Sequence, residues 1–189
     1  MEENLLLDSL RRRMRAMHSL YEDATATMDL THVNHFEREG VLPIAFSLFH
    51  YINMEDSSYF LITGEAPLFN EDWAARIDPA IADHGKHKTV EEMVHQRIGD
   101  LGEFIAYMNA VFARTEGWLR QLTRGDLDRV VIARPLPAQV ASTYSARVAG
   151  EQGITVLDAA ECWMYQHGLR HMGEIELGRG LVGLGGMTS

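Results

Sequence analysis

Long runs of apolar residues spaced three and four positions apart restrict the fold of this chain more than any other feature of its sequence. Such spacing places the apolar side chains on one face of a helix, which is then buried against neighbouring helices. The first run predicts a helix over about residues 4–28, of the kind that packs along a bundle. Its apolar face consists of Leu7, Leu10, Met14, Met17, Tyr21, Ala24 and Met28.

Two further helices follow from the same spacing and from residues typical of helix ends. The second is predicted over about 42–63, and Gly64 is the kind of residue that ends a helix. The third is predicted to begin at Thr89, because Thr89 and Glu92 have the spacing of a capping box. It continues without a break to about residue 122, with an apolar face of Val94, Ile98, Leu101, Ile105, Met108, Phe112, Thr115, Leu119 and Leu122.

The last long helix is predicted to begin at a cap formed by Thr155 and Asp158. Its buried face consists of Leu157, Ala160, Met164, His167, His171, Ile175 and Gly178. Four long helices predict an all-α fold. With 189 residues, 46% of them hydrophobic, the chain is expected to form one domain over residues 1–189 with a core of its own.

Two long connections separate these helices. Residues 64–88 contain a short helical turn, "NEDWAARI", whose Trp73 is expected to cover one end of the bundle. In residues 126–153, "VVIARPLP" fits either a short strand or an extended crossing, broken at Pro135. The stretch after it, "AQVASTYSARVAGEQG", predicts a short amphipathic helix.

Charge and composition exclude several classes of function. A net charge of −10 argues against nucleic-acid binding, which requires a basic surface, and the arginines at 11–13 and 15 are interpreted as a solvated helix face. No apolar stretch approaches the length of a membrane span, and the acidic N-terminus does not resemble a signal peptide. The only cysteine, Cys162, is interpreted as a small buried apolar residue. A cytoplasmic location is expected, because a single cysteine suits a reducing compartment.

The pair His167 and His171 interrupts the apolar face of the last helix. Residues four apart are neighbours on a helix, so two imidazoles can point at one metal ion. The spacer "GLR" lacks the glutamate of the zinc peptidases, which excludes that reaction. The alternative is a pair of core histidines, each hydrogen-bonded to backbone or side chains. The pair alone does not decide between the two interpretations.

A metal site requires a third ligand, and the chain has nine histidines. His50 is the best candidate, because it lies in mid-helix beside Phe46 and Phe49 and can face the interior of the bundle. Three imidazoles would leave at least one coordination position open, and they suit Zn, Ni, Fe or Cu. Six others are expected at the surface: His18, His32, His35, His84, His87 and His95.

One glycine motif is misleading. The stretch "GRGLVG", residues 178–183, matches the G-x-G-x-x-G pattern of dinucleotide-binding loops. That loop follows a strand, opens a helix and precedes an acidic residue about 20 positions later. Here the glycines close a helix near the end of the chain, which excludes a nucleotide site.

At this point the order of the motifs resembles a known family. The stretches "FHYINMEDSSYFLITGEAP", "EDWAAR", "HKTVEEMV" and "HGLRHMGEIELGRGLVGLGG" resemble the DinB-like (YfiT-related) metalloenzymes over nearly the whole chain. The resemblance is strongest to the subgroup with His-x3-His-x-Gly-Gln/Glu-Ile followed by Arg-Gly-Leu-x-Gly-Leu. Residues 126–153 depart from the shorter members, because this connection is longer.

The resemblance implies a four-helix bundle of the DinB/YfiT type with a long crossover connection, usually a homodimer. It implies a divalent metal, Zn or Ni, held by His50, His167 and His171. Glu174 stands where the motif carries Gln or Glu. Metal-bound histidines usually donate their second N–H to a carboxylate or carbonyl, and Glu55, Asp56 and Glu174 are the candidates. For Glu55 and Asp56 the alternative is a solvated helix surface.

Relatives of this kind include thiol-dependent transferases and isomerases that use bacillithiol, mycothiol or glutathione-type cofactors. The resemblance therefore implies a small-molecule substrate and a low-molecular-weight thiol bound to the metal, which deprotonates it. Two alternatives stay open: a metal-dependent hydrolase, and a non-catalytic, stress-related metal-binding bundle. The sequence contains no recognisable Ser–His–Asp or activated-cysteine arrangement.

Overall fold

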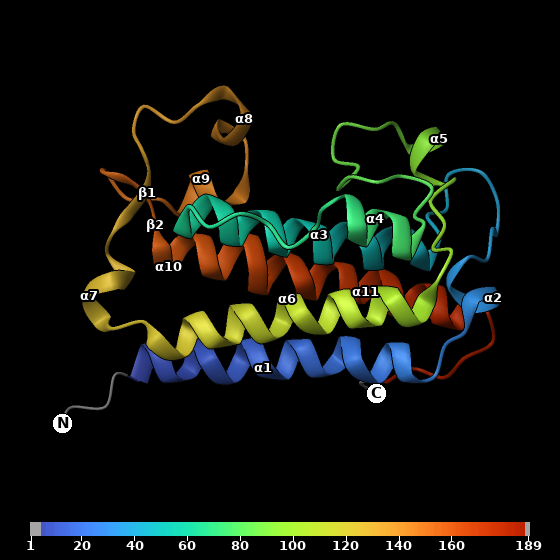
Figure 1. Cartoon of the computed structure of the whole chain (residues 1–189). Coiled ribbons are helices and arrows are strands. Elements are labelled where there is room, and N and C mark those ends of the chain that lie inside the picture. Colours follow the sequence, from blue (N-terminus) through green and yellow to red (C-terminus); the bar gives the residue numbers. More distant parts are fainter. Residues whose placement is uncertain (1–4, 188–189) are drawn as a thin grey trace.

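The computed structural model of the chain describes residues 5–187. Within these residues, four long helical segments run side by side and form a bundle (Figure 1). They are α1 (Leu5–Ala26), α3 (Ile44–Thr63), α6 (Leu101–Gln121) and a continuous last segment made of α10 (Val156–Ala159), the π-helix η1 (Ala160–Tyr165) and α11 (Gln166–Leu181). The predicted all-α bundle is confirmed.

Short elements occupy the connections between the long helices. They are α2 (Leu30–Val33), α4 (Glu71–Ile77), α5 (Val90–Met93), α7 (Arg124–Leu127), β1 (Val130–Ala133), α8 (Ala138–Ala141), α9 (Tyr144–Val148) and β2 (Gly153–Thr155). The segments that carry α5 and α8 both stand on the α3 side of the bundle, at opposite ends (Figure 1). Among the described residues, no helix is long and apolar enough to cross a membrane.

The predicted first, second and last helices agree with the structure to within a few residues. Residue 4, the predicted start of the first helix, lies outside the described residues. All seven residues of the apolar face predicted for the first helix are buried, including Met28, which follows the end of α1. Helix α3 is buried on almost every side and ends at Gly64, whose φ of 82° is the left-handed conformation of a helix C-cap. Thr155 and Asp158 form the predicted capping box ahead of α10.

The third predicted helix is wrong as a single element, because the chain leaves the helix between α5 and α6. Thr89 and Glu92 form the predicted capping box, but α5 lasts one turn. The backbone N–H groups of Gly99 and Asp100 donate to the carbonyl of Ile77, at the end of α4, instead of continuing a helix. The Asp100 side chain then caps α6. Periodicity missed the break because the residues on both sides of it are buried in one core.

Residues 126–153 form a small extension at one end of the bundle. The strand alternative is confirmed, since β1 pairs antiparallel with β2, which was not predicted. The predicted amphipathic helix is wrong: the stretch contains two single-turn helices, α8 and α9. Thr143 caps α9, and its hydroxyl accepts from the N–H of Ala146. This extension brings α9 against η1.

The first connection follows its prediction more closely. The predicted turn at "NEDWAARI" is α4, which Asn70 caps by accepting a hydrogen bond from the N–H of Trp73. The Trp73 ring lies 5.5 Å from the ring of Tyr107 on α6. The chain then passes over α3 as residues 78–88 before α5, and this stretch carries His84 to the second long helix.

Candidate metal centre

Three histidines from two helices meet where α3 packs on α11. His50 comes from α3, and His167 and His171 come from successive turns of α11. The ring centroid of His50 lies 4.7 Å from that of His171 and 5.3 Å from that of His167. One ligand atom from each ring lies within 4.8 Å of the other two. The three residues that the sequence singled out therefore form a histidine cluster that could hold a metal ion.

Two glycines of α11 allow this close approach of the helices. A Cβ atom at Gly168 would lie 2.4 Å from the Met17 sulfur and 2.7 Å from Cζ of Tyr51. A Cβ at Gly178 would lie 2.6 Å from Cγ1 of Ile44. Since real Cβ atoms do not approach so closely, any larger residue here would push α11 outward. These glycines set the distance between the histidines of α11 and His50.

The helix widens into the π-helix η1 directly before the histidines of α11. A π turn includes one more residue than an α turn, and such turns occur frequently at functional sites. Cys162 and Trp163 lie in this turn, and the Trp163 indole N–H donates to the Ser145 hydroxyl at 2.9 Å. The π-helix thus fixes the end of α9 beside the histidine cluster.

Hydrogen bonds fix the orientation of two of the rings. His50 donates from Nδ1 to the backbone carbonyl of His84. Nδ1 of His171 lies 2.7 Å from a carboxylate oxygen of Glu174, which also accepts from the hydroxyl of Ser47 at 2.7 Å. A proton on Nδ1 leaves the Nε2 lone pair free, which is the arrangement found in metal-bound histidines.

The charge state of the rings suits a cation. Burial, and then the nearby His171, lower the pKa of His167 to about 3 and that of His50 to about 4. Both rings are therefore neutral near pH 7, which is the form that binds metals. Burial alone would raise the pKa of Glu174, but the hydrogen bonds with His171 and Ser47 and the charge of the nearby histidines together outweigh it, so the pKa is lowered and the group is a carboxylate.

The residues fit a divalent metal ion. Nε2 of His167 and Nε2 of His171 are 2.9 Å apart. Two imidazole nitrogens bound to one tetrahedral zinc ion at about 2.0–2.1 Å would be roughly 3.3 Å apart, close to this separation. Without a cation, one of these two nitrogens must carry a proton and donate it to the other in a hydrogen bond. A shared ion satisfies both, and three protein ligands leave a position open.

A pocket of about 420 Å³ opens beside the histidine cluster. Its volume lies within the usual range for small-molecule sites, about 300–1,000 Å³. His50 and His167 form part of its wall. The other lining residues are Met54, Lys86, Ser142, Thr143, Tyr144, Ser145, Cys162, Trp163, Gln166 and Arg170. Sequence reasoning missed most of this wall because it is assembled from segments that are far apart in the chain: α3, the first connection, residues 142–145 and the last long helical segment.

Of the three carboxylates considered as partners of the ligands, only Glu174 contacts the histidine cluster among the described residues. Asp56 accepts from the backbone N–H groups of Leu68 and Phe69 and pairs with Arg114. Glu55 accepts from the hydroxyl of Tyr51. The alternative of a solvated surface is also wrong for Glu55 and Asp56, because both are fully buried.

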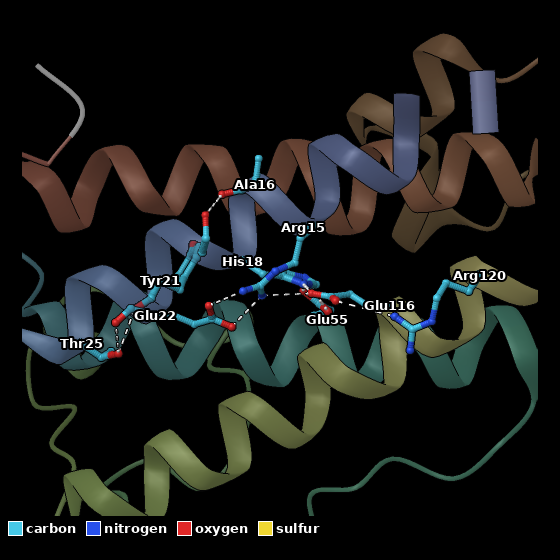
Figure 2. A network of polar contacts seen from close by, with 10 residues as sticks. Arg15, Ala16, His18, Tyr21, Glu22, Thr25, Glu55, Glu116 and Arg120 are labelled. Carbon is cyan, nitrogen blue, oxygen red and sulfur yellow. Dashed lines mark hydrogen bonds and ion pairs between the residues drawn. The ribbon is translucent and has the colours of Figure 1, made fainter. Parts of the chain in front are cut away.

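His18 was expected at the surface and is instead fully buried, which corrects that prediction. Its ring stacks on Phe112. Nδ1 lies 2.9 Å from Glu116 and Nε2 lies 3.3 Å from Glu55 (Figure 2). Arg15 extends this buried network outward by pairing with Glu116. The acidic partners lie 37 and 98 residues away in the chain, so local patterns gave no signal of them.

The remaining histidines and the arginine run are distributed as follows. His32, His35, His84, His87 and His95 are partly or fully exposed, as predicted. His84 and His87 form a second possible ligand group with Asp83 on the exposed first connection.

The prediction of a solvated arginine face is wrong for Arg11, because its guanidinium donates to the carbonyls of Leu119, Arg120 and Leu122 at the end of α6.

A helical bundle with a three-histidine cluster on its second and last long helices defines the class to which this protein is assigned. The chain matches the model of the DinB superfamily over residues 13–175 and belongs to that superfamily.

A solved structure has the same fold: "Crystal structure of the conserved protein of locus from Enterococcus faecalis", with a TM-score of 0.72 and 16% sequence identity. The match covers 93% of this chain and 95% of that one. A comparison with curated proteins finds no match.

Proposed function

We propose that the protein is a divalent-metal-dependent enzyme whose metal, zinc or nickel, is held by His50, His167 and His171. The observation that carries the proposal is the meeting of three imidazoles, two of which, His50 and His167, line a pocket of about 420 Å³. When bound, such an ion lowers the pKa of a thiol or a water molecule in the open position. A small substrate would occupy the rest of the pocket.

The residues of the chain position the reaction rather than supply the nucleophile. The carbonyl of His84 and the carboxylate of Glu174 orient the rings of His50 and His171. Cys162 lines the pocket, but burial and then Asp158 raise the pKa of its thiol to about 11, so it stays protonated at neutral pH. We propose that the thiolate comes from a low-molecular-weight thiol, whose sulfur adds to an electrophilic double bond of the substrate while the thiol proton ends on the adduct, so that no leaving group is needed.

Two other functions use the same cluster. A hydrolase would activate water and require no thiol. A non-catalytic bundle would use the metal for stability alone, and the pocket beside the cluster favours an enzyme over this alternative.

We further propose one domain over residues 1–189, a cytoplasmic location and a homodimer. Exposed apolar side chains on α11, among them Leu169 and Leu177, offer a surface for a second copy.

Metal analysis and mutagenesis test the proposal. Protein purified without chelator is expected to hold about one divalent ion per chain, and His50→Ala, His167→Ala and His171→Ala are each expected to lose it. His95→Ala, which changes an exposed histidine outside the cluster, is the matched control. A folded wild-type protein that binds neither zinc nor nickel would contradict the proposal. Turnover assays with and without added thiols then separate transferase from hydrolase.

A further inference from the structure

Two unpaired cations line the pocket beside the histidine cluster. Lys86 lies on the first connection, two residues after His84, and Arg170 lies on α11 between the two cluster histidines of that helix. Both side chains are exposed, and within residues 5–187 neither forms an ion pair with a carboxylate. Lys88, two residues from Lys86, does pair with an acid, with its Nζ 3.7 Å from Glu92.

The positive charge of Lys86 and Arg170 contrasts with the net negative charge of the chain. It has 27 acidic residues against 17 Lys and Arg. Three carboxylates on the segments that line the pocket are already engaged: Glu161 pairs with Arg13, Glu174 bonds to His171, and Asp83 accepts from the N–H of Gly85. Lys86 and Arg170 therefore leave a local positive potential at the pocket, which attracts anions from solution.

The other groups of the pocket divide into two kinds. Ser142, Thr143 and Gln166 provide neutral polar groups, and Met54 and Trp163 provide an apolar surface. This composition fits an elongated small molecule with one charged end. An arginine fork binds carboxylate and phosphate oxygens in pairs, and a lysine adds a mobile point charge.

We propose that the pocket binds a small molecule with an anionic oxygen group, a carboxylate or a phosphate, which Lys86 and Arg170 hold while its other end reaches the histidine cluster. The assignment of a thiol sulfur or a water molecule to the end that reaches the histidine cluster rests on the proposed function. The anion subsite itself depends only on Lys86 and Arg170. Lys86 and Arg170 are thus specificity-determining residues on two separate segments, the first connection and α11.

A thiol series tests this subsite in the full chain loaded with Co²⁺. The probes are ω-mercaptocarboxylates of two to six carbons and the matching ω-mercaptoalcohols, with binding measured from the thiolate-to-cobalt absorption band. For at least one chain length in the series, the acid is expected to bind about tenfold or more tightly than the alcohol, as for a charge-assisted contact.

Lys86→Met and Arg170→Gln are each expected to reduce this preference for the acid, and together to abolish it, without changing the affinity for the alcohol. Lys88→Met is the matched control and is expected to keep the preference.

The outcomes separate this inference from the proposed function. Equal affinity of acid and alcohol at every chain length overturns the anion subsite. If Co²⁺ is not held, or no thiol reaches it, the proposed function fails and the subsite is judged on metal-free protein. There, acetate and inorganic phosphate are titrated separately by NMR. Saturable shifts of the Lys86 and Arg170 amide signals that the double variant loses support the subsite for the anion that causes them; no saturable shift with either anion overturns it.

Discussion

Nε2 of His167 and Nε2 of His171 lie 2.9 Å apart on successive turns of α11, and Nδ1 of His171 bonds to Glu174 on its other side. The Glu174 carboxylate thus fixes the His171 ring through its Nδ1, while the Nε2 atoms of His167 and His171 face each other. Four predictions follow from this site and from the polar network behind it.

Replacing Glu174 by Ala is expected to weaken metal binding without removing a ligand. Loss of a carboxylate behind a metal-bound histidine typically reduces metal affinity by about 10–100-fold. Competition with a chromophoric chelator measures the zinc affinity. Glu151→Ala, which removes an exposed carboxylate far from the cluster in sequence, is the control. Unchanged affinity in Glu174→Ala would show that the carboxylate does not support the ligand.

Substitution of Gly168 and Gly173 by Ala is expected to have opposite effects although both residues lie on α11. A methyl group at 168 would collide with Met17 and the ring of Tyr51, whereas nothing lies within 4 Å of a Cβ at 173. Overpacking typically costs about 1–3 kcal/mol, so Gly168→Ala should destabilise the fold and also weaken metal binding. Gly173→Ala should stabilise the helix by up to about 1 kcal/mol. Urea unfolding curves measure both changes, and equal stabilities would contradict the close packing at Gly168.

The stability of the protein is expected to fall as the pH rises above about 6.5. Burial lowers the pKa of His18, but Glu55 and Glu116 outweigh it and raise the pKa from 6.5 to about 9. The folded state therefore holds this proton more tightly than the unfolded chain does. The contribution of the His18 proton to the free energy of unfolding is complete below pH 6.5 and is lost as the pH rises to about 9. The loss is on the order of 3 kcal/mol.

Denaturant unfolding at several pH values between 6 and 9.5 measures this effect. His18→Gln cannot titrate in this range, so its unfolding free energy should lack the part of the slope that comes from His18. Parallel pH profiles for wild type and His18→Gln would rule out a raised pKa of His18 in the folded protein.

A double-mutant cycle is expected to show strong coupling between His18 and Glu55. Both side chains are fully buried, and His18→Leu would leave the Glu55 carboxylate without its cationic partner. Breaking a buried ion pair typically costs about 3–5 kcal/mol, whereas replacing both partners by apolar residues costs much less. The double variant His18→Leu/Glu55→Leu should therefore recover most of the loss of His18→Leu in thermal or urea unfolding. Additive losses would contradict the coupling.

The sequence predicted the parts of the site that depend on local spacing. His167 and His171 share a helix face because they are four apart, and the regular pattern around them identified that face as buried. His50 stood out because a polar ring was placed among apolar neighbours on another long helix. Periodicity therefore identified the three residues of the cluster, and the structure brings them together.

The parts that sequence reasoning missed depend on contacts between distant segments. The third helix breaks because the N–H groups of Gly99 and Asp100 donate to the carbonyl of Ile77, which belongs to a different segment at the end of α4. His18 lies next to Met17 on the edge of an apolar face, where spacing does not separate a buried ring from an exposed one. Its acidic partners come from α3 and α6, so only the assembled bundle shows its burial.

The bond between the His50 ring and the His84 carbonyl joins the first connection to the histidine cluster. The backbone N–H of Lys86 in turn donates to Nδ1 of His84 at 3.0 Å. A single turn of chain therefore carries both the support of a ligand ring and a cation of the pocket wall. Equilibria that share one element are thermodynamically reciprocal. We therefore expect an anion that orders Lys86 to favour metal binding at His50, and a metal ion at His50 to raise the affinity for that anion by the same factor.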